Sequence, residues 1–266
     1  MRVRPAAVAG RFYPADRSAL ADLVDGLLAD VRPERPEHPV AVIAPHAGYR
    51  YSGAVAATAY AHLAPSRFRI TRVVVLGPAH VTPLRGMAVP SVDAFDTPLG
   101  PVEIDVDART AVIGTPGVAV HDHPHAGEHS IETQLPFLQR ALDPGVRALP
   151  LLVGHTPPAT VAALLSSLLA ETGTVAVVST DLSHYLPQPL AREQDAHTAA
   201  AIVARDGLAV GPADACGHWP LRGLLQHAAD RGLDVEVLRL ATSADAGADP
   251  GRVVGYGAFL LHDPPA

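Results

Sequence analysis

The chain has 266 residues, of which 48% are hydrophobic and 18% charged, a balance typical of a globular protein with a substantial core. A formal net charge of −7 gives no support for nucleic-acid binding, which needs a basic surface. No apolar run approaches the ~18 residues that cross a bilayer, and no signal-peptide pattern follows Met1. We therefore expect a cytoplasmic protein with no nucleic-acid or membrane partner, and its single cysteine excludes an internal disulfide.

Apolar runs of strand length recur along the whole chain. The runs at 40–44, 71–76 and 146–154 are nearly continuous, as in strands that are covered on both faces of a parallel sheet. The alternating segment 100–106 suggests a further strand, and two apolar runs near the carboxyl end predict closing strands. In chain order, the expected strands are 40–44, 71–76, 100–106, 146–154, 174–180, 234–243 and 253–262.

Segments typical of helices separate these strands. Ser52 and Ser130 offer side-chain caps for the first two helices, and Pro136 predicts either a kink or a late start in the second. Gly173 and Gly207 are expected to end two later helices. The predicted helices are 53–63, 131–142, 158–173, 192–207 and 221–232.

The order of the elements predicts one α/β domain over residues 1–266. Strands alternate with helices at short spacing, which favours a mostly parallel or mixed sheet with helices on both faces. The proline- and glutamate-rich segment 31–39 is the nearest thing to a linker. Only about 30 residues precede it, too few for a separate domain.

Polar side chains with metal-ligating chemistry follow three of the predicted strands. In open α/β sheets, ligands bind in the crevice outside the carboxyl ends of the strands. Glycines beside these residues, Gly48 and Gly77, allow close approach of the backbone. The residues expected to meet at this edge are His46, His80, Asp181 and His184, with Cys216 in a glycine-bearing loop before a helix.

Two imidazoles and a thiolate form a ligand set suited to zinc, iron(II) or copper, with open coordination positions. Asp181 could add an oxygen ligand or orient an imidazole, and helical spacing would put it on one face with His184. Taken singly, each histidine is more often a hydrogen-bonded structural group, and a lone cysteine a small buried hydrophobe. The prediction that these residues form one site therefore depends on the sheet topology, which would bring them to the same edge.

The remaining histidines have weaker support. His129 stands out because it lies at a predicted helix start beside Glu128, with Glu132 one helical turn after Glu128. The roles of these three residues stay open. Trp219 is expected in the core. A solvated loop is expected to hold His121, His123 and His125.

Five collinear motifs together resemble a known family. "APHAGYRYSG", "LGPAH", "EHSIETQLPFL", "VSTDLSHY" and "CGHWP" are similar to the successive motifs of the Memo family (mediator of ErbB2-driven cell motility), whose prokaryotic members are named AmmeMemoRadiSam system protein B. The match runs from about residue 4 to residue 261. It implies a fold similar to the LigB-like class III extradiol dioxygenases.

The resemblance also implies site residues. The metal ligands of the family carry over onto His46, His80 and Cys216, while Asp181 and His184 match the segment that lines the same pocket. The dioxygenases use two histidines and a carboxylate instead, so the thiolate is a departure from ring-cleaving chemistry. In a redox enzyme, His184 or Asp181 would serve as proton donor or acceptor.

We therefore expect a non-haem iron(II) or copper redox protein, a metal-dependent oxidoreductase of unknown substrate. The first alternative is a non-catalytic module that binds a peptide or partner in the same cleft. The second is a zinc hydrolase with Asp181 or Glu128 as the base. The resemblance further implies a small molecule or peptide as ligand, and association with a radical SAM enzyme and an AMMECR-type protein.

Overall fold

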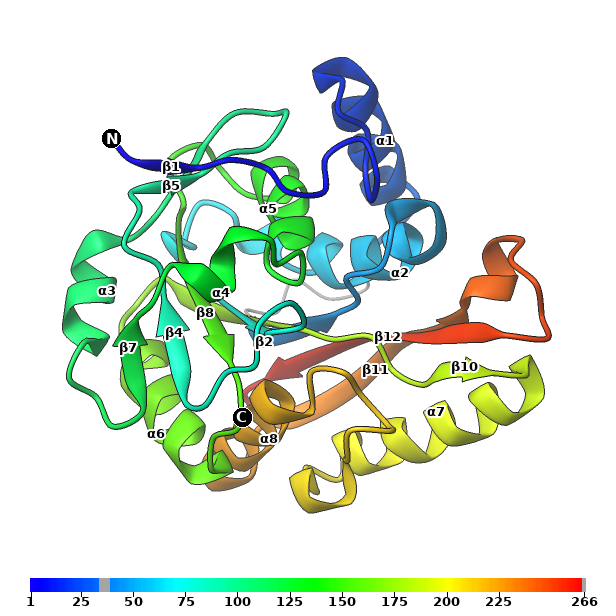
Figure 1. Ribbon diagram of the computed structural model, residues 1–266. Coiled ribbons are helices and arrows are strands. Elements are labelled where there is room, and N and C mark those ends of the chain that lie inside the picture. Colours follow the sequence, from blue (N-terminus) through cyan, green and yellow to red (C-terminus); the bar gives the residue numbers. More distant parts are fainter. Residues whose placement is uncertain (34–38, 265–266) are drawn as a thin grey trace.

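A computed structural model describes residues 1–33 and 39–264, and its centre is a mixed nine-stranded sheet (Figure 1). The four middle strands run parallel in the order β2 (Pro39–Ala44), β9 (Thr174–Ser179), β3 (Arg72–Pro78) and β8 (Arg147–Val153). Antiparallel neighbours extend the sheet at both sides. On the β2 side these are β12 (Val253–His262), β10 (His184–Leu186) and β11 (Asp234–Thr242). On the β8 side follow β4 (Met87–Val89), which is antiparallel to β8, and β7 (Val118–Val120), which is parallel to β4.

Helices cover both faces of this sheet (Figure 1). One face carries α1 (Arg17–Ala29), α2 (Tyr49–Ala61) and α5 (Leu135–Ala141). The other carries α6 (Pro158–Leu169), α7 (Gln188–Val203) and α8 (His218–Arg231). The shorter helices are α3 (Val106–Val112), α4 (His123–Ala126), η1 (Ala64–Ser66), η2 (Glu132–Gln134), η3 (Gly207–Ala209) and η4 (Ser243–Ala246). A second, three-stranded sheet contains β1 (Val3–Arg4), β5 (Ala94–Phe95) and β6 (Val102–Glu103).

The alternation of side chains along the buried strands divides the core in two. Val73 and Val75 of β3 pack toward α1, α2 and α5, whereas Val74 and Leu76 pack toward α6 and α8. All four are fully buried, as expected for a parallel strand with helices on both faces. The prediction of an α/β protein with a mixed, mostly parallel sheet is confirmed.

The predicted strands are all present, although 100–106 contains only the two-residue strand β6. The cap predictions are wrong. Ser52 lies inside α2 and donates to the carbonyl of Ala47, and Gly48 occupies the N-cap. Ser130 donates to the carbonyl of Pro78 on β3 instead of capping a helix. The late start foreseen for Pro136 is confirmed, since α5 begins at Leu135.

Two predicted helix ends also differ. Helix α6 ends at Leu169, before Gly173, and Gly207 opens η3 rather than closing α7. The residue that leaves the helical conformation after α7 is Arg205, with a φ of 59°. Residues 34–38 of the proline- and glutamate-rich segment lie outside the described residues.

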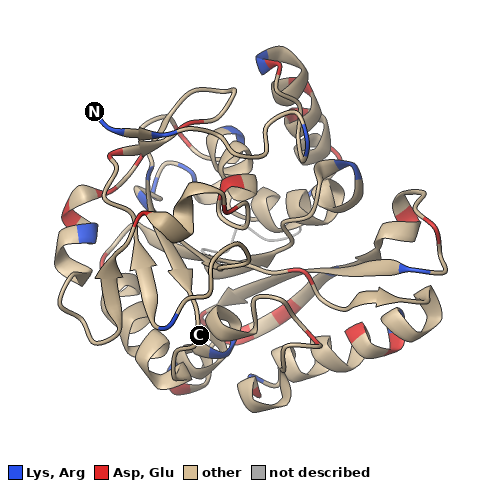
Figure 2. Ribbon diagram, viewed as in Figure 1, with Lys and Arg blue, Asp and Glu red and all other residues tan. Residues whose placement is uncertain are grey.

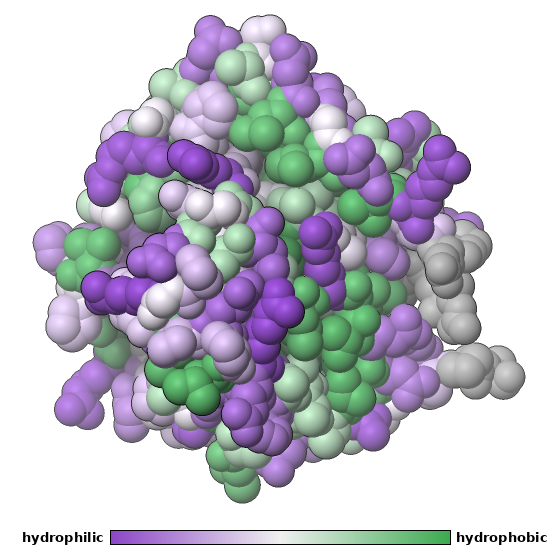
Figure 3. All heavy atoms as spheres, turned by 90° about the vertical axis from the view of Figure 1, so that its right-hand side faces the viewer, coloured by the Kyte–Doolittle hydropathy of each residue, from purple (hydrophilic) through white to green (hydrophobic). Residues whose placement is uncertain are grey.

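Charged residues are spread over the outer helices and loops, with both signs interspersed (Figure 2). The side of the molecule near β10 and the outer end of β11 shows hydrophobic side chains at the surface beside polar ones (Figure 3). Exposed apolar residues on elements of that side are Tyr185, Leu190 and Leu240. Within the described ranges, no helix is long and apolar enough to cross a membrane.

A buried ion pair fastens the amino-terminal segment to the fold. Glu132, which is fully buried in η2, accepts a hydrogen bond from Arg4 at 2.6 Å and another from the Tyr13 hydroxyl at 2.6 Å. Its carboxylate also accepts the backbone N–H groups of Ala7 and Val8. Glu132, whose role the sequence left open, is therefore a structural anchor.

Replacing Arg4 should test this anchor. Arg4→Ala leaves the Glu132 charge buried without its counterion, so we expect a loss of about 3–5 kcal/mol in the free energy of unfolding. Arg140→Ala is the matched control, because the Arg140–Asp25 pair is exposed and should contribute within about 1 kcal/mol. Urea unfolding of both variants provides the measurement, and equal losses would contradict the anchor.

Candidate metal centre

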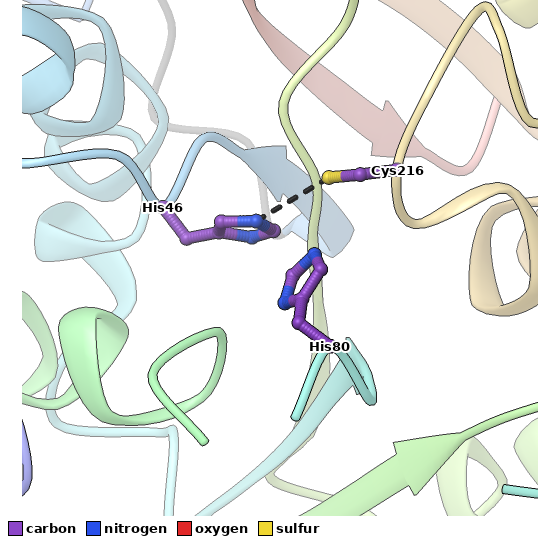
Figure 4. Close-up of side chains that lie close together, drawn as sticks. All are labelled: His46, His80 and Cys216. Carbon is purple, nitrogen blue, oxygen red and sulfur yellow. Dashed lines mark hydrogen bonds between the residues drawn. The ribbon is translucent and has the colours of Figure 1, made fainter. Parts of the chain in front are cut away.

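Three side chains from distant parts of the sequence converge at the carboxyl edge of the sheet (Figure 4). His46 follows β2, His80 follows β3, and Cys216 lies in the loop before α8. One ligand atom from each lies within 4.8 Å of the other two. The His46 ring is buried and the His80 ring is exposed, so the group opens to solvent on the His80 side. This convergence confirms the topological expectation.

Hydrogen bonds to Ser179 determine which nitrogen of His46 faces the group. The Ser179 hydroxyl donates to the Ser130 carbonyl at 2.6 Å and accepts from the Gln134 amide at 2.9 Å. Having used its one proton, it can only accept from His46 Nδ1, which lies 2.8 Å away. His46 Nδ1 therefore carries the proton. Nε2 faces Cys216 with a lone pair that is free to bind a metal ion.

Burial keeps the His46 ring neutral. It lowers the pKa of His46 well below its usual range, and the neighbouring rings of His80 and His129 add to this effect. The backbone N–H of His46 donates to Asp181 Oδ1 at 2.8 Å, which fixes the loop after β2. A neutral, oriented imidazole is the form that binds metal ions.

A carboxylate orients His80 in the same manner. Glu128 Oε1 lies 3.0 Å from His80 Nδ1, and Oε2 accepts the His80 backbone N–H. Burial opposes ionisation of Glu128, but hydrogen bonds from His80 and Ser130 hold the pKa of this carboxyl well below its usual range. The ionised carboxylate only accepts, so His80 Nδ1 bears the proton and Nε2 is the free nitrogen.

Cys216 is held against the end of β9. Its Sγ lies 3.3 Å from His46 Nε2 and 3.3 Å from the backbone nitrogen of Asp181. Burial, together with the nearby Asp181 carboxylate, raises the pKa of the Cys216 thiol to about 12. A side chain at Gly217 would place Cβ 2.7 Å from Thr180, so only glycine lets the loop approach β9 so closely.

Gly77 has the role expected from the sequence and Gly48 does not. A Cβ at Gly77 would lie 2.6 Å from the Ser130 hydroxyl, so the end of β3 could not reach the loop before η2. A Cβ at Gly48 would meet only ordinary contacts, the nearest at 3.6 Å.

Asp181 and His184 lie beside the group but not on a helix, and that part of the prediction is wrong. Residues 180–183 are irregular, and His184 opens β10. Asp181 Oδ2 is 4.0 Å from His46 Nε2, and burial raises the pKa of Asp181. The Nδ1 of His184 lies 2.8 Å from the carbonyl of Leu182.

A third imidazole completes the surroundings. The His129 ring centroid is 4.9 Å from that of His80 and 5.4 Å from that of His46. Its Nδ1 lies 3.2 Å from Glu128 Oε1. The position of His129 beside Glu128 was the only sequence signal for it.

The solvated loop predicted for three histidines is only partly correct. His121 and His123 are exposed, but His125 is buried in α4, with Nε2 3.0 Å from the carbonyl of Ala88. Arg4 donates to the His125 carbonyl, and the His125 ring packs against Phe95 with 5.9 Å between ring centroids. Trp219 is partly buried and packs against the core beneath α8.

Fold and site together define an α/β protein with a His/Cys group at the carboxyl edge of its parallel strands. The model of the Memo-like protein family matches residues 4–260. A MEMO1 family protein of Aquifex aeolicus is 40% identical over 199 residues, covering 73% of this chain and 72% of its own. Relatives from Ignicoccus hospitalis and Methanopyrus kandleri, also named MEMO1 family proteins, are each 35% identical and cover 97% of this chain and 98% of their own. The chain belongs to the Memo-like protein family.

The buried His125 predicts an acid-sensitive fold. Burial lowers the pKa of His125 to about 4, against about 6.5 in an unfolded chain. As the pH falls below about 6.5, the unfolded state takes up a proton that the folded state refuses, so stability is lost. For His125 the loss at pH 4.5 amounts to about 2–3 kcal/mol.

His125→Gln should therefore lose less stability on acidification. We expect the difference in unfolding free energy between pH 7.5 and pH 4.5, measured with urea, to shrink by about 2–3 kcal/mol. The other buried histidines titrate in both proteins and cancel in the comparison. His123→Gln, at an exposed position of the same helix, should leave the difference unchanged. An unchanged difference in His125→Gln would contradict the prediction.

Proposed function

We propose that the protein is a metal-dependent redox protein in which His46, His80 and Cys216 hold iron(II) or copper. The observation that carries this proposal is the convergence of two imidazoles and a thiol within 4.8 Å. The Nδ1 of each imidazole is hydrogen-bonded to another side chain, which leaves the lone pairs of the two Nε2 atoms free to bind the metal. Such outer partners are the usual means of orienting histidine ligands.

The chemistry of these donors fits a borderline-to-soft cation. Imidazole and thiolate suit iron, copper and zinc, whereas calcium and magnesium take oxygen ligands. A bound cation deprotonates a coordinating thiol, which overcomes the raised pKa of Cys216. Three protein ligands leave a coordination position for substrate or dioxygen, and the metal would supply electron transfer there.

Asp181 and His184 are proposed as the groups that move protons. Burial raises the pKa of Asp181, whose Oδ2 lies 4.0 Å from His46 Nε2, so this carboxyl is the proposed proton donor. The Nδ1 of His184 donates to the Leu182 carbonyl, so the Nε2 of the neutral ring is free to accept. Asp181 is thus the proposed proton donor and His184 the proposed acceptor.

We further propose the properties that the family resemblance implies. They are a fold akin to the extradiol dioxygenases, a small molecule or peptide as ligand, a cytoplasmic location, and association with a radical SAM enzyme and an AMMECR-type protein. A non-catalytic peptide-binding module and a zinc hydrolase are the competing functions.

Metal analysis of protein purified without added metal tests the proposal. We expect iron or copper at about one ion per chain, and turnover of dioxygen in the loaded protein. Zinc in place of both would favour a hydrolase, since two histidines and one cysteine also form a catalytic zinc site. A bound metal without dioxygen turnover would favour the binding module.

Substitution of Cys216 and Asp181 should distinguish a direct metal ligand from a residue that only lies beside the metal. Cys216→Ser replaces a thiolate with a hydroxyl that stays protonated at neutral pH, so one of three protein bonds to the metal is lost. Asp181→Asn keeps all three ligands and should weaken metal binding less, within the about 10–100-fold typical of groups that orient ligands. Competition titrations, with circular dichroism to verify folding, give the affinities. If Asp181→Asn were the more damaging change, a two-histidine, one-carboxylate centre would be the correct assignment.

A further inference from the structure

Glu128 contacts two imidazoles of the centre, the exposed ring of His80 and the partly buried ring of His129. Its Oε1 lies 3.0 Å from His80 Nδ1 and 3.2 Å from His129 Nδ1. The two rings are stacked, with an interplanar angle of 20° and 4.9 Å between centroids. Glu128 is 2% exposed, so no bulk water competes for these contacts. One buried carboxylate therefore faces the same nitrogen of two neighbouring rings.

Backbone N–H groups also donate to both oxygens of Glu128. Oε1 accepts the backbone N–H groups of His129 and Ser130 at 2.8 and 2.9 Å. Oε2 accepts those of His80 and Val81. With this many donors, the carboxylate is ionised and accepts only. The His80 contact is a hydrogen bond, and the His129 contact is a close approach of 3.2 Å. In each case a bare Nδ1 lone pair beside the anionic oxygen would be repelled, so the proton belongs on Nδ1.

We propose that Glu128 is a positioning residue that fixes the Nδ1–H tautomer of both His80 and His129. The Nε2 of His80 is thereby free for the metal. The Nε2 of His129 is free as a hydrogen-bond acceptor beside it, for a ligand that brings an O–H or N–H group. The second role rests on the proposed function, but the tautomers do not.

The same contacts argue against a second metal ion at this position. His80, Glu128 and His129 lie close enough to form a metal-binding group of their own. A cation there would need the two Nδ1 lone pairs, which are protonated, and carboxylate oxygens that already accept four backbone N–H groups. The geometry therefore assigns one metal ion per chain, with His129 outside its ligand set.

Nitrogen-15 spectra of the metal-free protein test the tautomers directly. At pH 8, well above the reference pKa of about 6.5, neutral rings show which nitrogen carries the proton. We expect unprotonated Nε2 in His80 and His129. A protonated Nε2 in either ring of the parent protein would overturn the proposal, whether or not any variant folds.

The variant Glu128→Gln tests whether the carboxylate determines the tautomers of the two rings. An amide has one acceptor oxygen and one NH₂ group, so one side of the side chain meets N–H donors that it cannot accept. We expect the Nδ1–H tautomer to be lost from at least one ring, and the affinity for iron(II) or copper to fall by about 10–100-fold. Unchanged tautomers in a folded Glu128→Gln protein would contradict the proposal. The control is His123→Gln, at an exposed position nearby. It removes the signals of one histidine, which helps to assign the spectra, and it should leave the tautomers of His80 and His129 unchanged.

Metal counting provides the second readout. Titration of the parent protein with iron(II) or copper should saturate at one ion, and His129→Gln should keep that ion with little change in affinity. Saturation at two ions, or loss of the ion in His129→Gln, would overturn the exclusion of His129 from the ligand set. Absence of any binding would refute the metal centre, while the spectra alone decide the tautomers.

Discussion

The parallel pairing of β2, β9 and β3 is the constraint on which the site depends. Register holds these strands side by side, from Ala44 opposite Ser179 to Leu76 opposite Val178, so their carboxyl ends meet at one edge. Burial of their apolar side chains on both faces makes this register costly to change, because a one-residue slip would turn every side chain to the other face. His46 and His80 meet as a consequence of core packing.

The segment from α4 to η2 connects the amino terminus to this edge. Glu132 holds the first strand and turn through Arg4 and Tyr13, while Ser130 and Glu128 contact the ends of β3 and the loop beyond. Within five residues, this segment therefore contains both contacts that stabilise the fold and contacts that orient the imidazoles. A change that loosens the amino terminus should therefore reach the imidazoles through the backbone of this segment.

Sequence reasoning succeeded where the signal was local or topological. Continuous apolar runs predicted the buried strands, and strand ends brought His46 and His80 to the same edge. It failed where a polar side chain has a distant partner. Ser130 looks like a helix cap in isolation, but its hydroxyl bonds to Pro78, a residue 52 positions away. The same applies to His125, whose loop composition suggests exposure but whose carbonyl accepts from Arg4 and whose ring nitrogen lies 3.0 Å from the carbonyl of Ala88.

Burial acts in opposite ways on two of the proposed ligands, His46 and Cys216, and that difference has a chemical consequence. Burial disfavours the charged form of any group, so it lowers the pKa of His46 and raises that of Cys216. His46 is thus already in the form that binds a metal, whereas the thiol must lose a proton. Metal affinity should therefore depend on pH chiefly through Cys216 at neutral and alkaline pH. The thiol supplies the only ligand charge, and it appears only when a cation is present to stabilise it.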